Sequence, residues 1–399
     1  MLALAGALLG CDATAPAPSP LARAPSTAPV LGMDWGRAAS VEGPANFQET
    51  VSPSFQGVHP ILRFAGQAMM TDVIGLPGGG FAAVGYAPPD WQPVSWTSAD
   101  GATWSLHSMG TTEFTFPVAL ASGSNGTTVA VGRAGNAPVA WTTVDGTAWQ
   151  RHAVPVLGEG GIAERMMTIV AGPRGYVAGG SVGPELADRH ARFWTSADGS
   201  AWEPVPDDPV SFANAEVRAI TAFEDGFVAV GVVGSMQDRT GSVVWTSPDG
   251  VNWTRIDDPA FDGGIAVAVV AAPFGGLVAV GSDLDRREGL AWTSPDGRSW
   301  LRPPGEVSRQ SRGGYVWMTD VVAIGDAVIG IGDYQGLQRG TGTSWVSRDG
   351  TSWERARTAP VQEQAEFYAI TPGGPGAIVV GSYGAPDSYL PRVWLTPSR

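Results

Sequence analysis

The stretch Trp245-Thr-Ser-Pro-Asp249-Gly250-Val-Asn-Trp253 is one of six near-identical copies of a pattern that recurs along the chain. The pattern is Trp-Thr-Ser-x-Asp-Gly-x-x-Trp. Its copies begin at Trp96, Trp141, Trp194, Trp245, Trp292 and Trp345, and a shorter seventh copy begins at Trp394. Successive starts lie 45 to 53 residues apart. This is the spacing of four-stranded propeller blades, and it is longer than that of ankyrin, tetratricopeptide or leucine-rich repeats.

Each copy has the chemistry of a tight β-hairpin. The residues of Trp96-Thr97-Ser98 alternate with period two, so the Trp and Ser side chains share one face of a strand. Asp100 and Gly101 supply the turn, because Gly adopts positive φ without steric cost and the Asp carboxylate accepts hydrogen bonds from turn amides. Two Trp per hairpin form an apolar face that a small unit cannot bury alone, so we expect neighbouring copies to stack.

The pattern resembles the Asp-box, or bacterial neuraminidase repeat, whose usual form is Ser-x-Asp-x-Gly-x-x-Trp. In this chain the Asp is followed directly by Gly, so Ser247-Pro-Asp249-Gly250-Val-Asn-Trp253 is one residue shorter than the usual form. The resemblance implies a sialidase-like β-propeller with the box in the turn between the third and fourth strands of each blade. The box is structural in the families that carry it, so it says little about activity.

The composition is that of a turn-rich globular protein. Gly contributes 55 of the 399 residues and Pro 32, and the hydrophobic content of 43% is ample for a core. The length alone would suit two or three domains, but the repetition from about residue 66 favours one large array. These features predict an all-β protein.

The charge balance excludes several functions. The formal net charge is −14, and all 24 fixed cations are arginines. A chain this acidic lacks the basic footprint of a nucleic-acid binder, and lysine-based chemistry has no residue to carry it. The four His and single Cys have no zinc-ligand spacing. We therefore expect no metal, no cofactor and no disulfide within the chain.

An apolar run occupies residues 1–10 and ends at the only cysteine, Cys11. The sequence Leu8-Leu9-Gly10-Cys11 resembles the lipobox of bacterial lipoprotein signal peptides, in which the Cys is lipidated. The run is too short to span a bilayer, and residues 11–30, rich in Ala, Pro, Ser and Thr, suit an extended tether. The resemblance implies a lipid-anchored protein of the bacterial cell envelope that faces outward, on the extracellular or periplasmic side. The alternative is a chance cysteine behind a hydrophobic N-terminus, and the missing positive charges leave open whether Met1 is the native start.

The remaining sequence repeats one order of strands. An innermost strand such as Met318-Thr-Asp-Val321 precedes a Gly-rich turn and a second strand such as Phe227-Val-Ala-Val-Gly231. A variable loop then leads to the Trp-Thr-Ser strand, the Asp-Gly turn and an outer strand. These units predict a propeller of seven four-stranded blades over residues 31–399, in which the repeated Trp residues pack the core.

The seventh copy lacks its fourth strand, and Trp35-Gly36-Arg37 is similar to the starts of fourth strands, such as Trp253-Thr-Arg255. We therefore expect residues 33–40 to pair with the strand around Val393 to Thr396 and to close the ring. We also expect a monomer.

The loops before the third strands carry candidate ligand-binding residues. Arg239, Arg286 and Arg339 each lie six residues before the Trp of their blade, so they should occupy similar positions in three consecutive blades. A partial ring of guanidinium groups could grip carboxylates, for instance on an acidic glycan. The alternative is a set of local Asp/Arg pairs on solvated loops. Trp91 and Trp317 lie outside the repeat and are candidates for stacking on a ligand, with plain loop packing as the alternative.

Catalysis has weaker support. The sialidase resemblance would require an arginine triad, a Tyr paired with Glu and an Arg-Ile-Pro motif, and the nearest sequence, Arg255-Ile256-Asp257, falls in an expected outer strand. Asp72 and Asp320, both on innermost strands, are weak candidates for the paired carboxylates of a glycosidase. The sequence therefore favours a non-catalytic, surface-anchored binding or scaffolding propeller for a glycan or protein partner. The alternative is a carbohydrate-active hydrolase, sialidase-like or another glycosidase, that acts at the channel mouth.

Overall fold

The computed structural model describes residues 68–87, 91–110, 114–156, 162–183, 189–234, 239–304, 307–309, 315–335, 340–355, 365–373, 376–383 and 390–395. All of them belong to one compact unit, Met33–Arg399. No helix in these ranges has the length and apolar character needed to cross a bilayer. Five predicted features lie outside the described residues: the signal peptide at 1–10, Cys11, the tether that ends at residue 30, the closing strand at 33–40, and Arg339.

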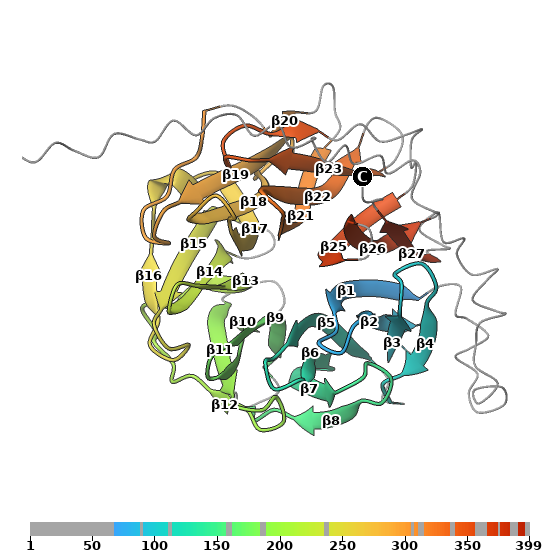
Figure 1. Cartoon of the computed structure of the whole chain (residues 1–399). Coiled ribbons are helices and arrows are strands. Elements are labelled where there is room, and N and C mark those ends of the chain that lie inside the picture. The colour runs from blue at the N-terminus through green and yellow to red at the C-terminus, as the bar shows by residue number, and fades with distance from the viewer. Residues whose placement is uncertain are drawn as a thin grey trace, which may run out of the picture. The chain divides into compact units, whose positions relative to one another are not determined.

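The described chain forms seven antiparallel sheets arranged around a central axis (Figure 1). The innermost strands are β1 (Met69–Gly75), β5 (Thr115–Ser122), β9 (Glu164–Gly172), β13 (Ala215–Phe223), β17 (Gly264–Ala271), β21 (Tyr315–Ile324) and β25 (Ala365–Gly373). The second strands are β2 (Phe81–Ala87), β6 (Thr128–Ala134), β10 (Gly175–Val182), β14 (Gly226–Val233), β18 (Leu277–Asp283), β22 (Ala327–Gln335) and β26 (Gly376–Tyr383). The third strands are β3 (Gln92–Ser98), β7 (Ala137–Thr143), β11 (His190–Ser196), β15 (Gly241–Ser247), β19 (Glu288–Ser294), β23 (Gly340–Ser347) and β27 (Leu390–Leu395). The outer strands are β4 (Ser105–Ser108), β8 (Gln150–Ala153), β12 (Glu203–Pro204), β16 (Thr254–Ile256), β20 (Ser308–Arg309) and β24 (Glu354–Arg355), and a 3-10 turn, η3 (Pro259–Phe261), precedes β17.

The all-β, seven-bladed prediction is confirmed. Six blades have four strands each, and the seventh has three within the described ranges. The expected innermost and second strands fall inside the observed ones. The fifth blade differs in detail, because Leu301 makes only an isolated bridge to Thr293 and the outer strand β20 pairs further along, at Glu288 and Gly289.

Every innermost strand has a β-bulge at the same level, and a glycine of the second strand faces it. A Cβ atom on that glycine would overlap the backbone carbonyl oxygen of the innermost strand, two residues before the bulged position. The final Gly of the repeated Val-Ala-Val-Gly segments is therefore required by this close approach. The glycines are Gly85, Gly132, Gly180, Gly231, Gly281, Gly332 and Gly381, and the bulged residues are Thr71, Val118, Met167, Arg218, Val267, Thr319 and Tyr368.

The Asp-Gly turns share one hydrogen-bond pattern. In the fourth blade the Ser247 hydroxyl accepts from the Gly250 amide at 2.9 Å, and Asp249 Oδ1 accepts from the next two amides at 2.9 and 2.8 Å. The Trp253 ring nitrogen donates to the Gly250 carbonyl at 2.9 Å, which ties the second Trp to the turn. A Cβ on Gly250 would overlap Val177 of the preceding blade, so each turn also covers its neighbour. The other five copies repeat the Ser or Thr, Asp and Trp bonds.

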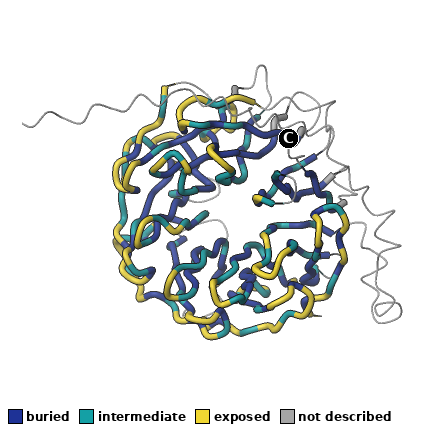
Figure 2. The backbone as a smooth tube through the Cα atoms, in the orientation of Figure 1, coloured by how far each residue is buried: buried dark blue, intermediate teal, exposed yellow. Residues whose placement is uncertain are grey.

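The core lies between the blades. The first Trp of every copy is buried, at 0% exposure in six and 2% in Trp394, and exposed residues gather at the turns and the periphery (Figure 2). Burial of each ring contributes on the order of 4 kcal/mol as an upper estimate. One cluster joins Phe81 of the first blade to Ile378 and Leu395 of the seventh. The ring is therefore closed by side-chain packing between these two blades.

Candidate functional site

The antiparallel blades present two different faces. The turn face carries the Asp-Gly turns and the turns between first and second strands. The loop face carries the loops from second to third strands and the connections into the next innermost strand. Loops on a rigid scaffold carry most ligand-binding residues, and the four predicted ligand-binding residues that the structure describes, Trp91, Arg239, Arg286 and Trp317, belong to the loop face.

Four arginines from three consecutive blades meet on the loop face, and we call them the arginine cluster: Arg189, Arg218, Arg239 and Arg286. Arg189 directly precedes β11, Arg218 is the bulged residue of β13, Arg239 lies before β15, and Arg286 lies between β18 and β19. Glu216 of β13 sits among them. Its carboxylate pairs with Arg189 and, at 2.8 Å, with Arg218, and it also accepts from the Ser181 hydroxyl at 3.2 Å.

The electrostatics of the cluster are strongly positive. Burial lowers the pKa of Arg239, and the charges of Arg218 and Arg286 lower it further, with a smaller effect from Arg189. Burial alone would raise the pKa of Glu216, but the adjacent arginines outweigh it and hold the carboxyl below its ordinary value. Four guanidinium groups and one carboxylate give a formal charge of +3 on a chain of net charge −14.

Two of these arginines have no acidic partner among the residues that the structure describes. Within the described ranges, neither Arg239 nor Arg286 forms an ion pair with a carboxylate. Asp238, the acid next to Arg239, lies outside the described residues, so the alternative of local Asp/Arg pairs on solvated loops stays a prediction. A guanidinium held near other guanidinium groups favours an anion that accepts from several of them at once.

Arg286 is held in place by its backbone and by Trp317 of the next blade. Its φ is +56°, and its carbonyl accepts from the Val316 amide at 2.7 Å. Its guanidinium carbon lies 4.2 Å from the centroid of the Trp317 ring, which is a cation–π contact. Beside them, the narrow hollow between the arginines has an apolar lining of Val232, Ile265 and Val267. The site thus combines cations, an indole face and a small apolar floor.

The structure brings together three of the five ligand-binding residues predicted from sequence, namely Arg239, Arg286 and Trp317. Trp91 lies elsewhere on the loop face, beside Tyr86 and Phe116, and Arg339 lies outside the described residues. The set of five did not include Arg189, Arg218 or Glu216. The local signal for Arg189 is its place in the recurring Asp-Arg pattern, and the signal for the other two is the charged Glu-Val-Arg run at the start of an otherwise apolar innermost strand.

Asp72 and Asp320 join neighbouring blades through backbone amides. Asp72 accepts from its own strand at Val73 (2.7 Å) and from Leu120 of the next blade (2.7 Å). Asp320 likewise accepts from the Val321 amide of its own strand at 2.8 Å and from the Ile370 amide of the next blade at 2.9 Å. Both carboxyl groups thus help to hold neighbouring blades together. Their catalytic role stays a prediction.

Burial shifts both of these carboxyl groups. It raises the pKa of Asp72 to about 8, with the charge of Asp320 adding to the effect, and it raises the pKa of Asp320 to about 7. The amide hydrogen bonds oppose these shifts without reversing them. Both residues keep some solvent-exposed surface. The raised pKa values therefore come from the dense protein around the carboxyl groups and not from complete exclusion of water.

A second acidic group, not predicted from the sequence, lies on the sixth and seventh blades. The Tyr368 hydroxyl donates to Glu366 at 2.5 Å and lies 3.1 Å from the Ser382 hydroxyl. Asp333 accepts from the Phe367 amide at 3.1 Å, and burial together with the charge of Glu366 raises its pKa to about 8. Burial and the adjacent carboxylate raise the pKa of Tyr368 above its ordinary value, which disfavours a phenolate nucleophile.

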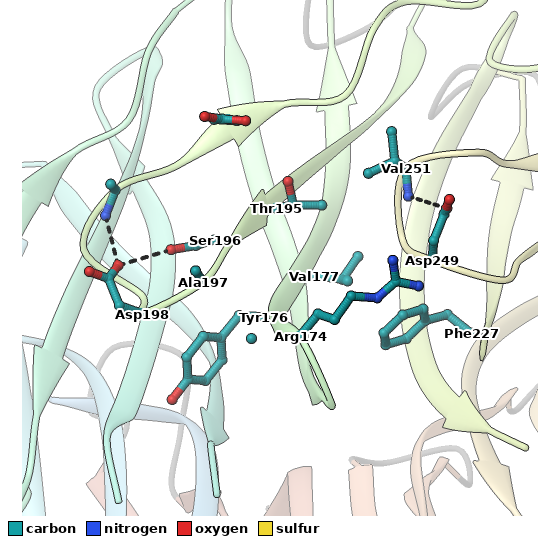
Figure 3. A pocket seen from close by; sticks show the side chains of 13 residues that line it. Arg174, Tyr176, Val177, Thr195, Ser196, Ala197, Asp198, Phe227, Asp249 and Val251 are labelled. Atoms are coloured by element: carbon teal, nitrogen blue, oxygen red, sulfur yellow. Dashed lines mark hydrogen bonds between the residues drawn. The ribbon is translucent and has the colours of Figure 1, made fainter. Parts of the chain in front are cut away.

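The turn face has a larger hollow, of about 380 Å³, between the third and fourth blades (Figure 3). Its lining includes Arg174, Tyr176, Phe227, Asp198 and Asp249. Turn hydrogen bonds dominate the chemistry of its acids: although burial acts to raise the pKa of Asp249, the Asn252 and Val251 amides outweigh it and lower it to about 2. Volume alone would favour this hollow, but two of its three acids, Asp198 and Asp249, are already engaged in turns, so the arginine cluster is the better candidate site.

No group of three or more His, Cys, Asp or Glu in the described part of the chain could hold a metal ion. His107 and His152 instead lie 2.8 Å from the hydroxyls of Thr97 and Thr142. Burial lowers the pKa of both imidazoles, so they are neutral strand-pairing residues at pH 7.

No protein-family model and no curated protein sequence matches this chain. Among solved structures, the chain is similar to YCF48 bound to D1 peptide, with a TM-score of 0.51, 17% identity, and coverage of 83% of this chain and 93% of that chain. It is also similar to a protein of unknown function from Dyadobacter fermentans, with a TM-score of 0.50, 15% identity, and coverage of 83% and 95%. A sialidase from Trypanosoma rangeli in complex with sialic acid aligns with a TM-score of 0.46, 11% identity, and coverage of 71% of this chain and 55% of the sialidase. At these identities the similarities show the propeller fold alone.

Proposed function

We propose that this chain is a non-catalytic binding propeller whose arginine cluster takes up a carboxylate group of a glycan or protein partner. The observation that carries the proposal is the pair Arg239 and Arg286, which have no carboxylate partner within the described ranges and lie in a cluster of formal charge +3. A carboxylate accepts bidentately from guanidinium groups, and it would offset the repulsion that lowers the pKa of Arg239.

The acids of the chain support a binding role over a catalytic one. Asp72 and Asp320 each accept from two backbone amides, one of them in the next blade, which gives both carboxyl groups a structural role in joining blades. A related fold, YCF48, was solved bound to D1 peptide, which is an example of a propeller of this kind that takes up a peptide.

The membrane anchor and the repeat identity belong to the same proposal. We propose that the six turns are Asp-boxes shortened by one residue, since all six share the Ser or Thr, Asp and Trp hydrogen bonds. We propose further that Cys11 is lipidated and that residues 11–30 tether the propeller outside the membrane of a bacterial envelope. A lipid anchor suits a binding module that must stay at the surface.

The alternative function is a carbohydrate-active hydrolase, and one observation favours it. Glu366 and Tyr368 form a hydrogen-bonded pair, and the nearby Asp333 has a raised pKa suited to a general acid. A hydrolase would shorten a bound glycan, whereas a binding module would retain it unchanged.

The test is to present the purified chain to immobilised uronic-acid, sialylated and neutral glycans and to acidic peptides, reading bound protein and shortened product. Arg239→Ala and Arg286→Ala should lower retention on carboxylate-bearing spots at least tenfold. Arg298→Ala is the matched control. It removes an exposed arginine from the turn face and should leave retention on the carboxylate-bearing spots unchanged. Retention that survives both cluster variants would contradict the proposed site. Shortened product that is lost in Glu366→Gln would establish the hydrolase instead.

A further inference from the structure

A cluster of aromatic rings lies on the loop face between the first and second blades. The ring centroid of Trp91 lies 5.5 Å from that of Tyr86 and 6.2 Å from that of Phe116. The Tyr86 and Phe116 centroids are 5.0 Å apart. The Arg133 guanidinium lies 4.5 Å above the Phe116 ring. We call these four residues the aromatic platform. All four are partly exposed.

Directly before β5, the backbone holds a large side chain at Phe114 where two later blades have Asn or Gly. Phe114 has a φ of +52° and its carbonyl accepts from the Gly135 amide, and the equivalent positions in later blades are Asn214 and Gly263, with φ of +50° and +71°. The Phe114 side chain is 56% exposed, so burial does not offset the strain of this conformation. Trp91 also has a positive φ, of +52°. The exposed Phe114 ring therefore stands directly before the strand β5 that carries Phe116 of the platform.

The platform repeats the chemistry of the arginine cluster. Arg286 lies on Trp317 at 4.2 Å and Arg133 lies on Phe116 at 4.5 Å, and each pair belongs to the loop face. Each pair joins a flat apolar ring to a guanidinium group. A ligand that fits one of these pairs should therefore fit the other with a second copy of the same chemical unit.

We propose that the platform is a second subsite for the same ligand, and that the ligand is an acidic glycan with a carboxylate on successive sugars. This inference rests on the proposed function of the arginine cluster. An acidic sugar offers the two required surfaces together, because its C–H face can stack on the Trp91 ring while its carboxylate accepts from Arg133, which lies over the neighbouring Phe116 ring. The platform belongs to the first and second blades and the arginine cluster to the third to fifth, so only a glycan long enough to reach both makes the second contact intramolecular.

A glycan fits the platform better than an extended peptide does. A peptide that adds to a sheet needs free backbone groups along the edge. Two described amides that border the platform are already used, since Thr115 donates to the Trp91 carbonyl at 3.0 Å and Gly135 donates to the Phe114 carbonyl at 3.0 Å. The described platform therefore offers mainly side chains, which suits the ring faces and carboxylates of a sugar chain.

The experiment measures the dissociation constants of oligogalacturonates from one to about ten units by calorimetry, with methyl-esterified oligomers of equal length and acidic peptides beside them. We expect the long oligomer to bind at least ~100-fold more tightly than the single unit. The esterified oligomer should lose most of this affinity, because it has lost the carboxylates.

Trp91→Asn is the decisive variant, because Asn tolerates the left-handed backbone of Trp91 and removes the ring. It should lower the affinity for the long oligomer at least tenfold, toward the value of the single unit, whereas Arg286→Ala should weaken both ligands. Glu224→Asn is the matched control, since Glu224 has a φ of +51° and lies on the turn face. It should change the affinity for neither the long oligomer nor the single unit.

The outcomes separate the two proposals. If Trp91→Asn leaves long-oligomer affinity unchanged while Arg286→Ala still lowers it, the second subsite is wrong and the arginine cluster stands. If acidic peptides bind through Arg286 and no oligogalacturonate does, the glycan is wrong while the carboxylate site survives. If no carboxylate ligand responds to Arg286→Ala, the proposed function itself fails.

Discussion

The Arg286 guanidinium lies 4.2 Å from the ring centroid of Trp317, although the two residues belong to different blades. The contact fixes the direction of a cation that has no carboxylate partner among the described residues. Under the proposed function, Trp317 therefore contributes to ligand binding partly by positioning Arg286.

We predict that Trp317→Ala weakens carboxylate binding about 3- to 30-fold, which corresponds to about 0.5–2 kcal/mol for a cation–π contact. Trp317→Phe should keep most of the affinity, because Phe retains a ring face for the guanidinium. Calorimetry with a single uronic acid measures the effect, and the thermal unfolding midpoint reports whether the variants remain folded. Equal losses in both variants would show that the ring face does not position the arginine.

A pH dependence of stability follows from Asp333. Burial and the charge of Glu366 raise its pKa from 3.8 to about 8, so the folded chain keeps a proton that the unfolded chain releases. The contribution of the protonated Asp333 to the free energy of unfolding is therefore fully present below about pH 4 and is lost as the pH rises to about 8. Asp333→Asn mimics the protonated form and should make the unfolding free energy less dependent on pH in this window, by up to a few kcal/mol. Urea unfolding from pH 4 to 9 measures this, with the exposed Asp225→Asn as control, and an unchanged slope would contradict it.

The glycine opposite each bulge should tolerate no side chain. We expect Gly281→Ala to destabilise the propeller by several kcal/mol, because the new Cβ would overlap the Ile265 carbonyl oxygen and the carbonyl is fixed in a sheet. Gly78→Ala is the control, since no atom lies within 4 Å of its added Cβ. The midpoint of urea unfolding compares the two, and similar midpoints would mean that the bulge can relax.

The Asp-Gly turns should stabilise the fold through the carboxylate. Asp249→Ala removes the acceptor for the Val251 and Asn252 amides, and the loss of such a cap costs about 1–2 kcal/mol. Asp225→Ala, at an exposed turn of the same blade, should have little effect on the unfolding free energy. Because hydrogen bonds lower the pKa of Asp249 to about 2, the difference between wild type and Asp249→Ala should persist at pH 5 and fade only as the pH falls toward 2.

The blades and their turns could be predicted because their causes are local. Asp249, Gly250 and Trp253 interact within one hairpin. The alternation of buried and outward-facing side chains in the Trp-Thr-Ser strand follows directly from the order of consecutive residues. Repetition then strengthened the prediction, since six copies of one hairpin must stack to bury their Trp rings. The site was only partly predictable. Equal offsets from the repeat Trp placed Arg239 and Arg286 in similar positions, but nothing in the offsets showed that Glu216 would pair with Arg189 and Arg218.

The sequence by itself determined the fold of this protein, its seven blades and the loops where ligand-binding residues gather, because these depend on contacts between residues close in the chain. The tertiary structure decided which side chains meet. Arg239 and Trp317 line one hollow from blades far apart in sequence, whereas Asp72 and Asp320 bind backbone amides of the following blades. These outcomes depend on the packing of each blade against the next, which local periodicity does not encode.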